Sequence, residues 1–307
     1  MTSAPRYASP IDTATHGEYS YVRAAGDERP LYRFSGRVTA DGSSGFPAEP
    51  GRYHLYVGWF CPWSQRSTIQ RLLNGLADVV SVSFVDNARD GRGWAFRETH
   101  GPDPVNGFSV LREAFEATEP GYDGHISVPV LWDRATNRLV SNDYATIDVD
   151  LATQFAAWGT DADTYPVPSR AAIDDLDRWL GPGLNHGISA AAASRPEAGT
   201  ARTRLLRTLT DLDTRLAHQR YLLGDQLALV DVRLWVSLVR FDAEPNAKRT
   251  LSPGLPEYPH LWAYARELYQ QSAFRDSTDF AAFTVEGATV PDWESPIEQP
   301  RPATVSP

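Results

Sequence analysis

The stretch from residue 53 to residue 85 constrains the fold more than any other part of this sequence. An apolar run at 53–57 is followed by an amphipathic segment at 62–74 and by a run rich in β-branched residues at 79–85. Two strand-type runs separated by one helix-length segment are typical of a β-α-β unit with a right-handed crossover and parallel strands. The sequence therefore predicts an α/β layer in this part of the chain.

The corner between the first predicted strand and the predicted helix carries the only cysteine of the chain, Cys61. Pro62 fits the first helical position, where its missing N–H is not needed. The sulfur is therefore expected on the N-terminal turn of the helix, where free backbone N–H groups and the helix dipole favour thiolate over thiol. Arg66, one turn further along, either adds positive potential there or pairs with a carboxylate.

A lone cysteine is more often a small buried apolar residue than a nucleophile. The neighbours of Cys61 argue against that interpretation, because Trp59, Phe60 and Trp63 place aromatic side chains around a Cys-Pro pair. Core filling explains such a corner poorly. We therefore predict that Cys61 is a reactive nucleophile.

Composition excludes several other classes of function. The net charge of −10 and the pI near 5.2 argue against a nucleic-acid partner, which needs a basic surface. No apolar run approaches the roughly 20 residues that span a bilayer, and the N-terminal residues lack the apolar core of a signal peptide. One cysteine allows no internal disulfide, and no His, Asp or Glu cluster has zinc-ligand spacing. We expect a cytoplasmic protein without a metal, a membrane partner or nucleic acid.

A second group of strand-type segments follows an insertion at 86–125, which we expect to be functional because connections of this length are uncommon. Strands are predicted at 127–132 and 138–140, joined by a short polar link as in a hairpin, and a helix at 143–156. The order β-α-β followed by β-β-α is that of a thioredoxin-like domain. In that fold a proline at the start of the third strand is cis and faces the active cysteine, and Pro129 occupies this place.

After a proline-containing linker at 165–168 the sequence changes to helical periodicity. Apolar residues recur at spacings of three and four, which predicts a series of helices. The positions that carry this pattern are Ile173, Leu176, Leu180, Leu205, Leu206, Leu209, Leu212, Leu216, Val230, Leu234, Leu238, Val239, Leu261, Ala265 and Leu268. We predict an extended arm at 1–50 that lies on the body of the protein, a thioredoxin-like domain at 51–160, an all-helical domain at 168–290 and an irregular tail at 291–307.

A thioredoxin-like domain with such a cysteine, followed by an all-helical domain, resembles the glutathione transferases. Several sequence blocks, in order along the chain, narrow the resemblance to the xi class, the glutathionyl-hydroquinone reductases. These blocks are Gly51–Val57 with Cys61-Pro62-Trp63, Gly93–Phe96, Ser127–Asp133, Arg220–Asp225, Asp231–Leu234, Leu238–Asp242 and Tyr258–Tyr264.

The resemblance implies a redox chemistry of thiols. Cys61 would attack the sulfur of a thioether such as a glutathionyl-hydroquinone, and the hydroquinone would leave. A second thiol would then resolve the mixed disulfide. Trp94 and the backbone of Val128 would hold the bound thiol, and Pro129 would shape its pocket.

The resemblance also implies a place for the aromatic substrate. Tyr264 would assist as a phenolic donor to the leaving group. Trp63, Asn185 and His186 would line the substrate pocket, the latter two in the Asn-x-Gly turn of the family. A homodimer is expected by analogy to the family.

The chain departs from the family pattern where the family binds the γ-glutamyl end of glutathione. The family has Asn-Glu-Ser-Ser there, and this chain has Asn142-Asp143-Tyr144-Ala145 after Ser141. Asp143 keeps a carboxylate, but the ring of Tyr144 replaces a hydroxyl, a change that a polar site rarely tolerates with the same ligand. Asp143, Tyr144 and Arg66 are therefore expected to define the thiol site. The family also has a tyrosine soon after its Asn-x-Gly turn, where this chain has Ile188-Ser189, and another after Phe241-Asp242, where this chain has Glu244-Pro245. Ala228 stands in place of a capping Thr.

These departures lead to a hypothesis about the thiol. Lys248 is the only lysine among many arginines, which indicates a GC-rich coding genome. Some GC-rich bacteria use mycothiol, a cysteinyl sugar conjugate, and an altered γ-glutamyl pocket would suit it. The expected cofactor is a low-molecular-weight thiol, either glutathione or mycothiol.

Two other functions stay open at this point. In a transferase that conjugates a thiol to a specialised metabolite, Cys61 would stabilise the cofactor thiolate instead of attacking. A non-catalytic binding relative would keep the fold without the full set of acids.

Among the histidines, His54 is predicted to be a satisfied core residue and His260 a helix cap.

Overall fold

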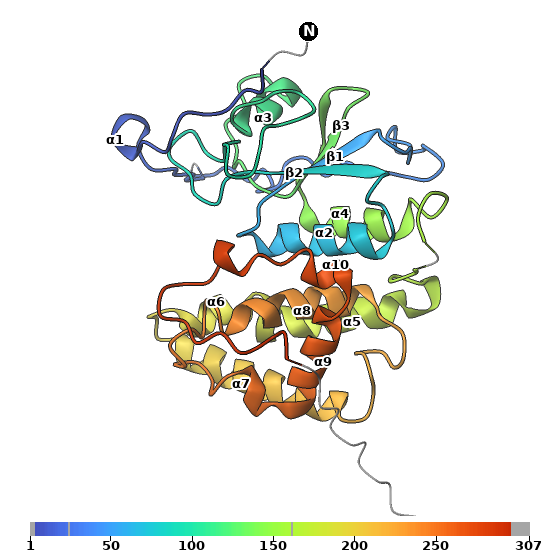
Figure 1. Cartoon of the computed structure of the whole chain (residues 1–307), viewed down its shortest axis with the longest axis vertical. Helices are drawn as coiled ribbons and strands as arrows, with labels where there is room; N and C mark the ends of the chain where they lie inside the picture. Colours follow the sequence, from blue (N-terminus) through green and yellow to red (C-terminus); the bar gives the residue numbers. More distant parts are fainter. Residues whose placement is uncertain (1–3, 24, 161, 296–307) are drawn as a thin grey trace, which may run out of the picture. The chain divides into compact units, whose positions relative to one another are not determined.

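The computed structural model describes residues 4–23, 25–160 and 162–295, and the chain divides into two compact units at residues 1–162 and 163–307. Figure 1 shows the first unit in blue to green and the second in yellow to red. The division falls between the predicted thioredoxin-like domain, which ends at residue 160, and the predicted helical domain, which begins at residue 168.

The first unit contains a four-stranded sheet with the order β2-β1-β3-β4. The strands are β1 (Tyr53–Val57), β2 (Val80–Phe84), β3 (Val130–Asp133) and β4 (Arg138–Ser141). Strand β1 pairs in parallel with β2 and antiparallel with β3, which in turn pairs antiparallel with β4. This is the predicted thioredoxin-like topology. The third strand begins later than the predicted residue 127.

Helices α2 (Pro62–Leu73) and α4 (Tyr144–Thr153) cover one face of the sheet (Figure 1). All five residues of β1 are buried, and they alternate between two apolar clusters. Leu55 and Val57 join the cluster on the helix side, whereas Tyr56 packs with Cys61 on the other. Because β1 is buried on both faces, its position is fixed, and so is the position of the cysteine corner that follows its C-terminal end.

His54 occupies the position in β1 that the sequence assigns to a satisfied core histidine, and this prediction is confirmed. Its Nδ1 lies 2.7 Å from Ser81 Oγ and its Nε2 lies 2.8 Å from Ser83 Oγ, both on the neighbouring strand β2. Burial lowers the pKa of His54 to about 3, so the ring stays neutral at physiological pH.

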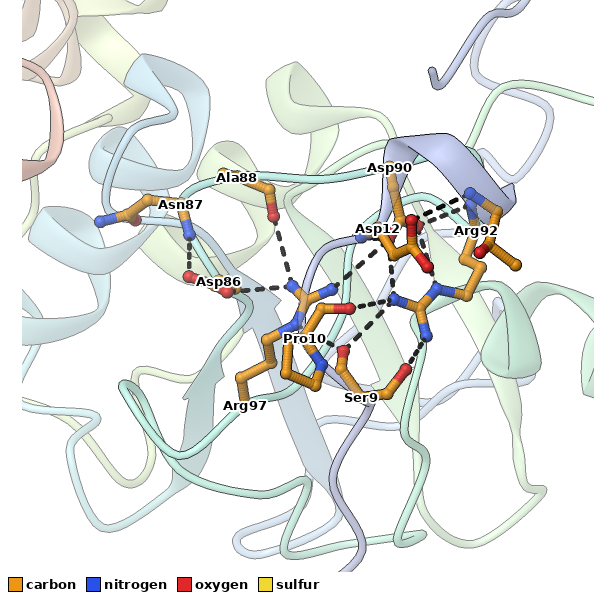
Figure 2. A network of polar contacts seen from close by, with 10 residues as sticks. Ser9, Pro10, Asp12, Asp86, Asn87, Ala88, Asp90, Arg92 and Arg97 are labelled. Atoms are coloured by element: carbon orange, nitrogen blue, oxygen red, sulfur yellow. Dashed lines mark hydrogen bonds and ion pairs between the residues drawn. The ribbon is translucent and has the colours of Figure 1, made fainter. Parts of the chain in front are cut away.

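The described part of the predicted arm lies on the first unit, as expected of an arm on the body of the protein. It contains one short helix, α1 (Thr13–His16), and the Ala8 N–H donates to the Phe96 carbonyl O at 2.9 Å. Figure 2 shows how arginines of the 86–125 insertion bind this part of the arm. Arg92 donates to the carbonyl O of Pro10 at 2.9 Å, and Arg97 donates to that of Ser9 at 3.1 Å.

The insertion also contains helix α3 (Arg112–Thr118), and a carboxylate of its first turn binds the loop that precedes it. Glu113 Oε1 accepts from the backbone N of Ser109 at 2.9 Å and from that of Val110 at 3.1 Å. Its other oxygen binds Arg6 of the arm at 2.8 Å. Glu113 thus ties the start of α3 both to the preceding loop and to the arm.

The second unit is helical, as the leucine spacing predicts. Its α-helices are α5 (Arg170–Leu180), α6 (Gly187–Ala192), α7 (Ala198–Leu216), α8 (Leu229–Phe241), α9 (Pro259–Tyr269) and α10 (Ser272–Arg275). Three 3-10 turns accompany them at Val167–Ser169, Leu255–Glu257 and Phe280–Ala282. Helix α8 is the most deeply buried, with twelve of its thirteen residues in the core.

A π-helical turn, η2 (Gly181–Asn185), follows α5 directly. Pro182 lacks the N–H that would continue the α-helical hydrogen bonds, and the His186 N–H reaches back to the Gly181 carbonyl O at 2.8 Å. The turn carries two predicted site residues, Asn185 and His186, at its end. The leucine periodicity gives no sign of it.

One residue of the predicted irregular tail, Trp293, is anchored in the second unit. Trp293 is 3% exposed and packs edge-on against Trp262 with ring centroids 4.8 Å apart. Residues 296–307 lie outside the described residues. In the described ranges, no helix has the length and apolar character needed to cross a membrane.

Candidate active site

Cys61 is the N-cap residue of α2, with φ −92° and ψ 117°. Its Sγ lies 3.5 Å from the backbone N of Ser64 and 3.5 Å from the carbonyl O of Val128. The Ser64 N–H is one of the donors that the first turn of a helix leaves unpaired, so it can stabilise negative charge on the sulfur. Cys61 is 6% exposed. This position, on the N-terminal turn of the helix, is the one that the sequence predicts.

The loop before β3 brings the opposite side of this corner into place. The Val128–Pro129 peptide bond is cis, as expected for this fold. Val128 is buried and presents its carbonyl to the Cys61 sulfur. The structure therefore brings the predicted residues Cys61 and Val128 together, with Pro129 next in the chain.

Trp94 forms an aromatic wall with Phe60, the residue before the cysteine. The two rings stack with centroids 4.2 Å apart and an angle of 27° between their planes. On Trp94 lies the guanidinium of Arg89, 4.1 Å from the ring centroid, and the same guanidinium lies 4.0 Å from the ring centroid of Tyr19. Burial lowers the pKa of Arg89, yet the π-faces of both rings favour its positive charge.

Trp63 and Tyr144 form a second aromatic wall just after the cysteine. Their rings stack with centroids 4.4 Å apart at 18°. The ring of Tyr32, from the arm, meets Tyr144 edge-on at 5.8 Å. Arg66 is 3% exposed, and its guanidinium lies 4.5 Å from the Trp63 centroid. The predicted thiol-site residues Tyr144 and Arg66 thus both contact Trp63.

Asp143 caps the start of α4. Its Oδ1 accepts from the Ala145 N–H at 3.1 Å, and the residue is half-buried. Asn142, its neighbour, is buried and donates to Ser127 Oγ at 3.1 Å. The N-terminus of α4 favours negative charge, and the Asp143 carboxylate already occupies it as the cap.

Tyr264 lies in the helical unit and is 4% exposed. Its hydroxyl donates to Asp231 Oδ1 at 2.9 Å. The Asp231 carboxylate also accepts from the backbone N–H groups of Leu222 and Ala228, each at 2.9 Å. Burial raises the pKa of Asp231 to about 6 and that of Tyr264 well above its usual value. The phenol therefore already has a structural partner at the start of α8.

Asn185 and His186 also belong to the helical unit. Asn185 Oδ1 accepts from Ser237 Oγ at 2.7 Å, which ties the π-helical turn to α8. His186 is exposed. His260 is the second residue of α9, and its backbone N–H donates to Asp213 Oδ1 at 2.8 Å. The helix at residue 260 is thus capped by Asp213, not by the histidine side chain.

Sequence reasoning missed three residues of the aromatic walls: Tyr19, Tyr32 and Arg89. The two tyrosines lie in a region without periodicity, and the arginine lies in the insertion. Nothing in their spacing indicates that they meet near residue 61. As to metals, the described residues contain no group of three His, Cys, Asp or Glu side chains that could hold an ion.

Comparison with known proteins identifies the family to which this geometry belongs. The family model "Glutathione S-transferase, C-terminal domain" matches residues 170–267. The glutathionyl-hydroquinone reductase YqjG of Escherichia coli is 33% identical over 285 residues, covering 88% of this chain and 87% of that protein. The glutathionyl-hydroquinone reductase PcpF of Sphingobium chlorophenolicum is 37% identical over 229 residues, covering 71% and 72%. The chain belongs to the xi class of the glutathione transferases.

Solved structures confirm the two-part architecture of this xi-class enzyme. A xi-class glutathione transferase from Natrialba magadii superposes with a TM-score of 0.80 at 31% identity, covering 86% of this chain and 90% of that one. Glutathione-bound YqjG superposes with a TM-score of 0.77 at 33% identity, covering 81% and 85%. The relatives are transferases and reductases, so they give no support to the non-catalytic alternative.

Proposed function

We propose that this xi-class enzyme is a thiol-dependent reductase of the glutathionyl-hydroquinone type with Cys61 as nucleophile. The Cys61 thiolate attacks the sulfur of an aryl thioether, so that a sulfur–sulfur bond forms and the carbon–sulfur bond breaks. The electron pair of the broken bond stays on the hydroquinone carbon, which takes up a proton. A second molecule of thiol then attacks the mixed disulfide and releases the Cys61 thiolate with a disulfide of the two thiols. The conjugate is reduced, and the thiols are oxidised.

The observation that carries this proposal is the position of the Cys61 sulfur. It lies at the helix N-terminus, 3.5 Å from a backbone N–H, in a corner shielded from bulk water. An N–H donor and the helix dipole favour both the attacking thiolate and its return as leaving group in the second step. Two relatives named glutathionyl-hydroquinone reductase support the same substrate class.

The thiol would bind beside Cys61 in the first unit. The backbone of Val128 offers hydrogen-bonding groups next to the sulfur, Trp94 offers an apolar wall, and Pro129 limits the pocket. If the thiol is glutathione, Asp143 at the start of α4 would receive its ammonium end. That YqjG, a relative with the same fold, has been solved with glutathione bound supports a thiol of this kind as the ligand.

Mycothiol is the thiol that we favour at this site. The observation behind it is the stack of Tyr144 on Trp63, with centroids 4.4 Å apart, where the family pattern has a small hydroxyl residue. This ring narrows the place for a γ-glutamyl group and offers a flat apolar surface to a sugar. Glutathione is the alternative, supported by the names of the relatives.

Tyr264 is the proposed acid for the leaving hydroquinone. The hydrogen bond from Tyr264 to Asp231 explains this residue as a structural one. Its proposed role as an acid therefore rests on the resemblance to the family. In the conjugating alternative, Cys61 would stabilise the cofactor thiolate and form no mixed disulfide. A cytoplasmic homodimer is part of the proposal on grounds of composition and family; light scattering tests the dimer.

The test is intact-protein mass spectrometry after incubation with oxidised glutathione and, separately, with oxidised mycothiol. The proposal predicts a mass gain of one thiol per chain, which a reducing agent removes. The single cysteine means that any such adduct is on residue 61.

A matched variant, Cys61→Ser, should give no adduct and no release of hydroquinone from its thiol conjugate. Retained turnover in Cys61→Ser would favour the conjugating alternative. Adduct formation with glutathione alone would refute the mycothiol hypothesis but leave the cysteine mechanism standing.

A further inference from the structure

The arm is attached to the same loop that carries Trp94. Arg92 and Arg97 bind the backbone of Ser9, and Asp90 accepts from the Asp12 N–H at 3.1 Å (Figure 2). Asp90 is fully buried, and hydrogen bonds from Arg92 hold its pKa well below the usual range. A buried, paired carboxylate of this kind fixes the geometry of its surroundings, because breaking the pair would leave a charge without a partner.

The backbones also approach closely where the arm crosses the loop. The Gly91 N–H donates to the Gly17 carbonyl O at 2.8 Å. A Cβ atom on Gly91 would lie 1.9 Å from the carbonyl O of His16, so no other residue fits there without moving the arm. The arm is thus seated against the insertion by backbone contact as well as by charge.

From this seat the arm reaches the first aromatic wall through Tyr19. The Arg89 guanidinium lies over both the Tyr19 ring and the Trp94 ring, and Trp94 stacks on Phe60. The Tyr19 hydroxyl accepts from the backbone N–H of Ile126 at 2.9 Å, just before the segment that contacts Cys61. The order from the arm inward is therefore tyrosine, guanidinium, tryptophan and the residue next to the cysteine.

The arm reaches the second wall through Tyr32. Phe34 exchanges two hydrogen bonds with Asn142, one from each backbone N–H, at 3.1 Å and 2.9 Å. The Gly36 N–H donates to the Val140 carbonyl O at 2.9 Å, so the arm runs along the end of β4. This attachment holds the Tyr32 ring against Tyr144, which stacks on Trp63. Burial raises the pKa of the Tyr32 phenol, and the neighbouring Tyr144, Cys61 and Asp143 add to the rise.

We propose that the N-terminal arm is a working part of the thiol site, in which Tyr19 and Tyr32 position the two aromatic walls that flank Cys61. The inference rests on the proposed function in taking the space between these walls as the place of the thiol. Tyr32 acts as a specificity-determining residue, because it supports the ring of Tyr144 where the γ-glutamyl end of glutathione would lie. Tyr19 acts as a positioning residue for Trp94.

The first test measures thiol kinetics in arm variants of the full-length enzyme. Tyr32→Ala should raise the KM for the accepted thiol about three- to tenfold, the equivalent of one aromatic pair, with kcat changed less than about twofold. Tyr32→Phe keeps the ring and should recover most of this loss. Leu31→Ala changes the exposed neighbour and is the matched control.

The second test reads the site without any thiol. The only cysteine makes iodoacetamide alkylation a measure of Cys61 alone. Tyr19→Ala and Tyr32→Ala should each raise the alkylation rate severalfold at fixed pH, because the walls that shield the sulfur loosen. Glu18→Ala, a change at an exposed arm residue, should leave the rate unchanged.

The two tests separate this inference from the proposed function. An absence of any thiol adduct on the wild type, with faster alkylation in the tyrosine variants, would overturn the proposed function and support the arm's role. A lower melting temperature without a change in KM or in alkylation rate would mean that the tyrosines only stabilise the fold, and the inference would be overturned.

Discussion

At the scale of single residues, the surroundings of His54 were predictable from the sequence and those of Tyr32 were not. A histidine in an apolar strand must find partners for both ring nitrogens or cost free energy, and serines on the next strand-type run were available to supply them. Tyr32 lies among turn residues whose backbone direction no periodicity fixes. Its contact with Tyr144 depends on hydrogen bonds between Phe34 and Asn142, residues that are distant in sequence.

His54 gives a prediction about stability and pH. Its folded pKa of about 3 lies below the unfolded value, so the unfolded chain binds more protons between the two. The neutral ring therefore contributes fully to stability above about pH 6.5. Below that value the free energy of unfolding falls by about 1.4 kcal/mol for each pH unit. Urea unfolding at pH 7 and pH 5 should show a steeper loss for the wild type than for His54→Gln, which forms hydrogen bonds but does not titrate.

His16→Gln, a change at an exposed histidine, is the control and should keep the wild-type pH dependence. Equal losses in the wild type and in His54→Gln would contradict the buried neutral state.

A second prediction at this scale concerns Tyr144. Tyr144→Ser restores the small hydroxyl residue of the family pattern and removes the ring that stacks on Trp63. We expect kcat/KM for glutathione, relative to mycothiol, to rise about tenfold, because the γ-glutamyl end gains space and hydrogen-bonding partners. Competition kinetics with both thiols measure this ratio. An unchanged ratio would show that position 144 does not select the thiol.

At the scale of elements, strands and long helices followed from the sequence, and short irregular turns did not. Strand β1 and helix α2 have sustained apolar patterns and a proline at the right boundary, so their bounds were predictable to within a residue. The π-helical turn at 181–185 depends on one proline and on one hydrogen bond that spans it. Such a feature has no period, and pattern reasoning cannot find it.

A substitution at Tyr264 separates its two explanations, a structural partner of Asp231 at the start of α8 and an acid for the leaving group. Tyr264→Phe removes one hydrogen bond from Asp231 and should lower the free energy of unfolding by about 1–2 kcal/mol. If the phenol is also the acid for the leaving group, kcat should fall by about a hundredfold or more. Stability from urea unfolding and kcat from hydroquinone release give the two values for one variant.

Asp231→Ala is the reference for a purely structural loss at the same place. It leaves two backbone N–H groups and the Tyr264 hydroxyl without their acceptor, so unfolding should become easier by about 3 kcal/mol or more. A Tyr264→Phe variant with lowered stability and nearly normal kcat would remove Tyr264 from the mechanism.

At the scale of the whole molecule, the family and the order of domains were predictable because they depend on motifs spread along the chain. The path of the arm was not predictable, since it is set by contacts between residues about eighty positions apart, such as Asp12 with Asp90. The candidate site therefore divides in two. The cysteine corner is local and could be derived from sequence, whereas the arm's part in the aromatic walls could not.

Gly91 allows the arm to be displaced without touching either wall or any charge. Gly91→Ala places a methyl group within 1.9 Å of the His16 carbonyl O, which is backbone and must move. We expect the amides of residues 8–17 to exchange with deuterium at least about tenfold faster, with a parallel rise in Cys61 alkylation, because the first wall loses its outer support. Gly199→Ala, in α7, where a Cβ would meet open space, should change neither measurement. Faster exchange with unchanged alkylation would mean that the arm can leave its seat without loosening the cysteine corner, which would contradict the coupling of arm and site.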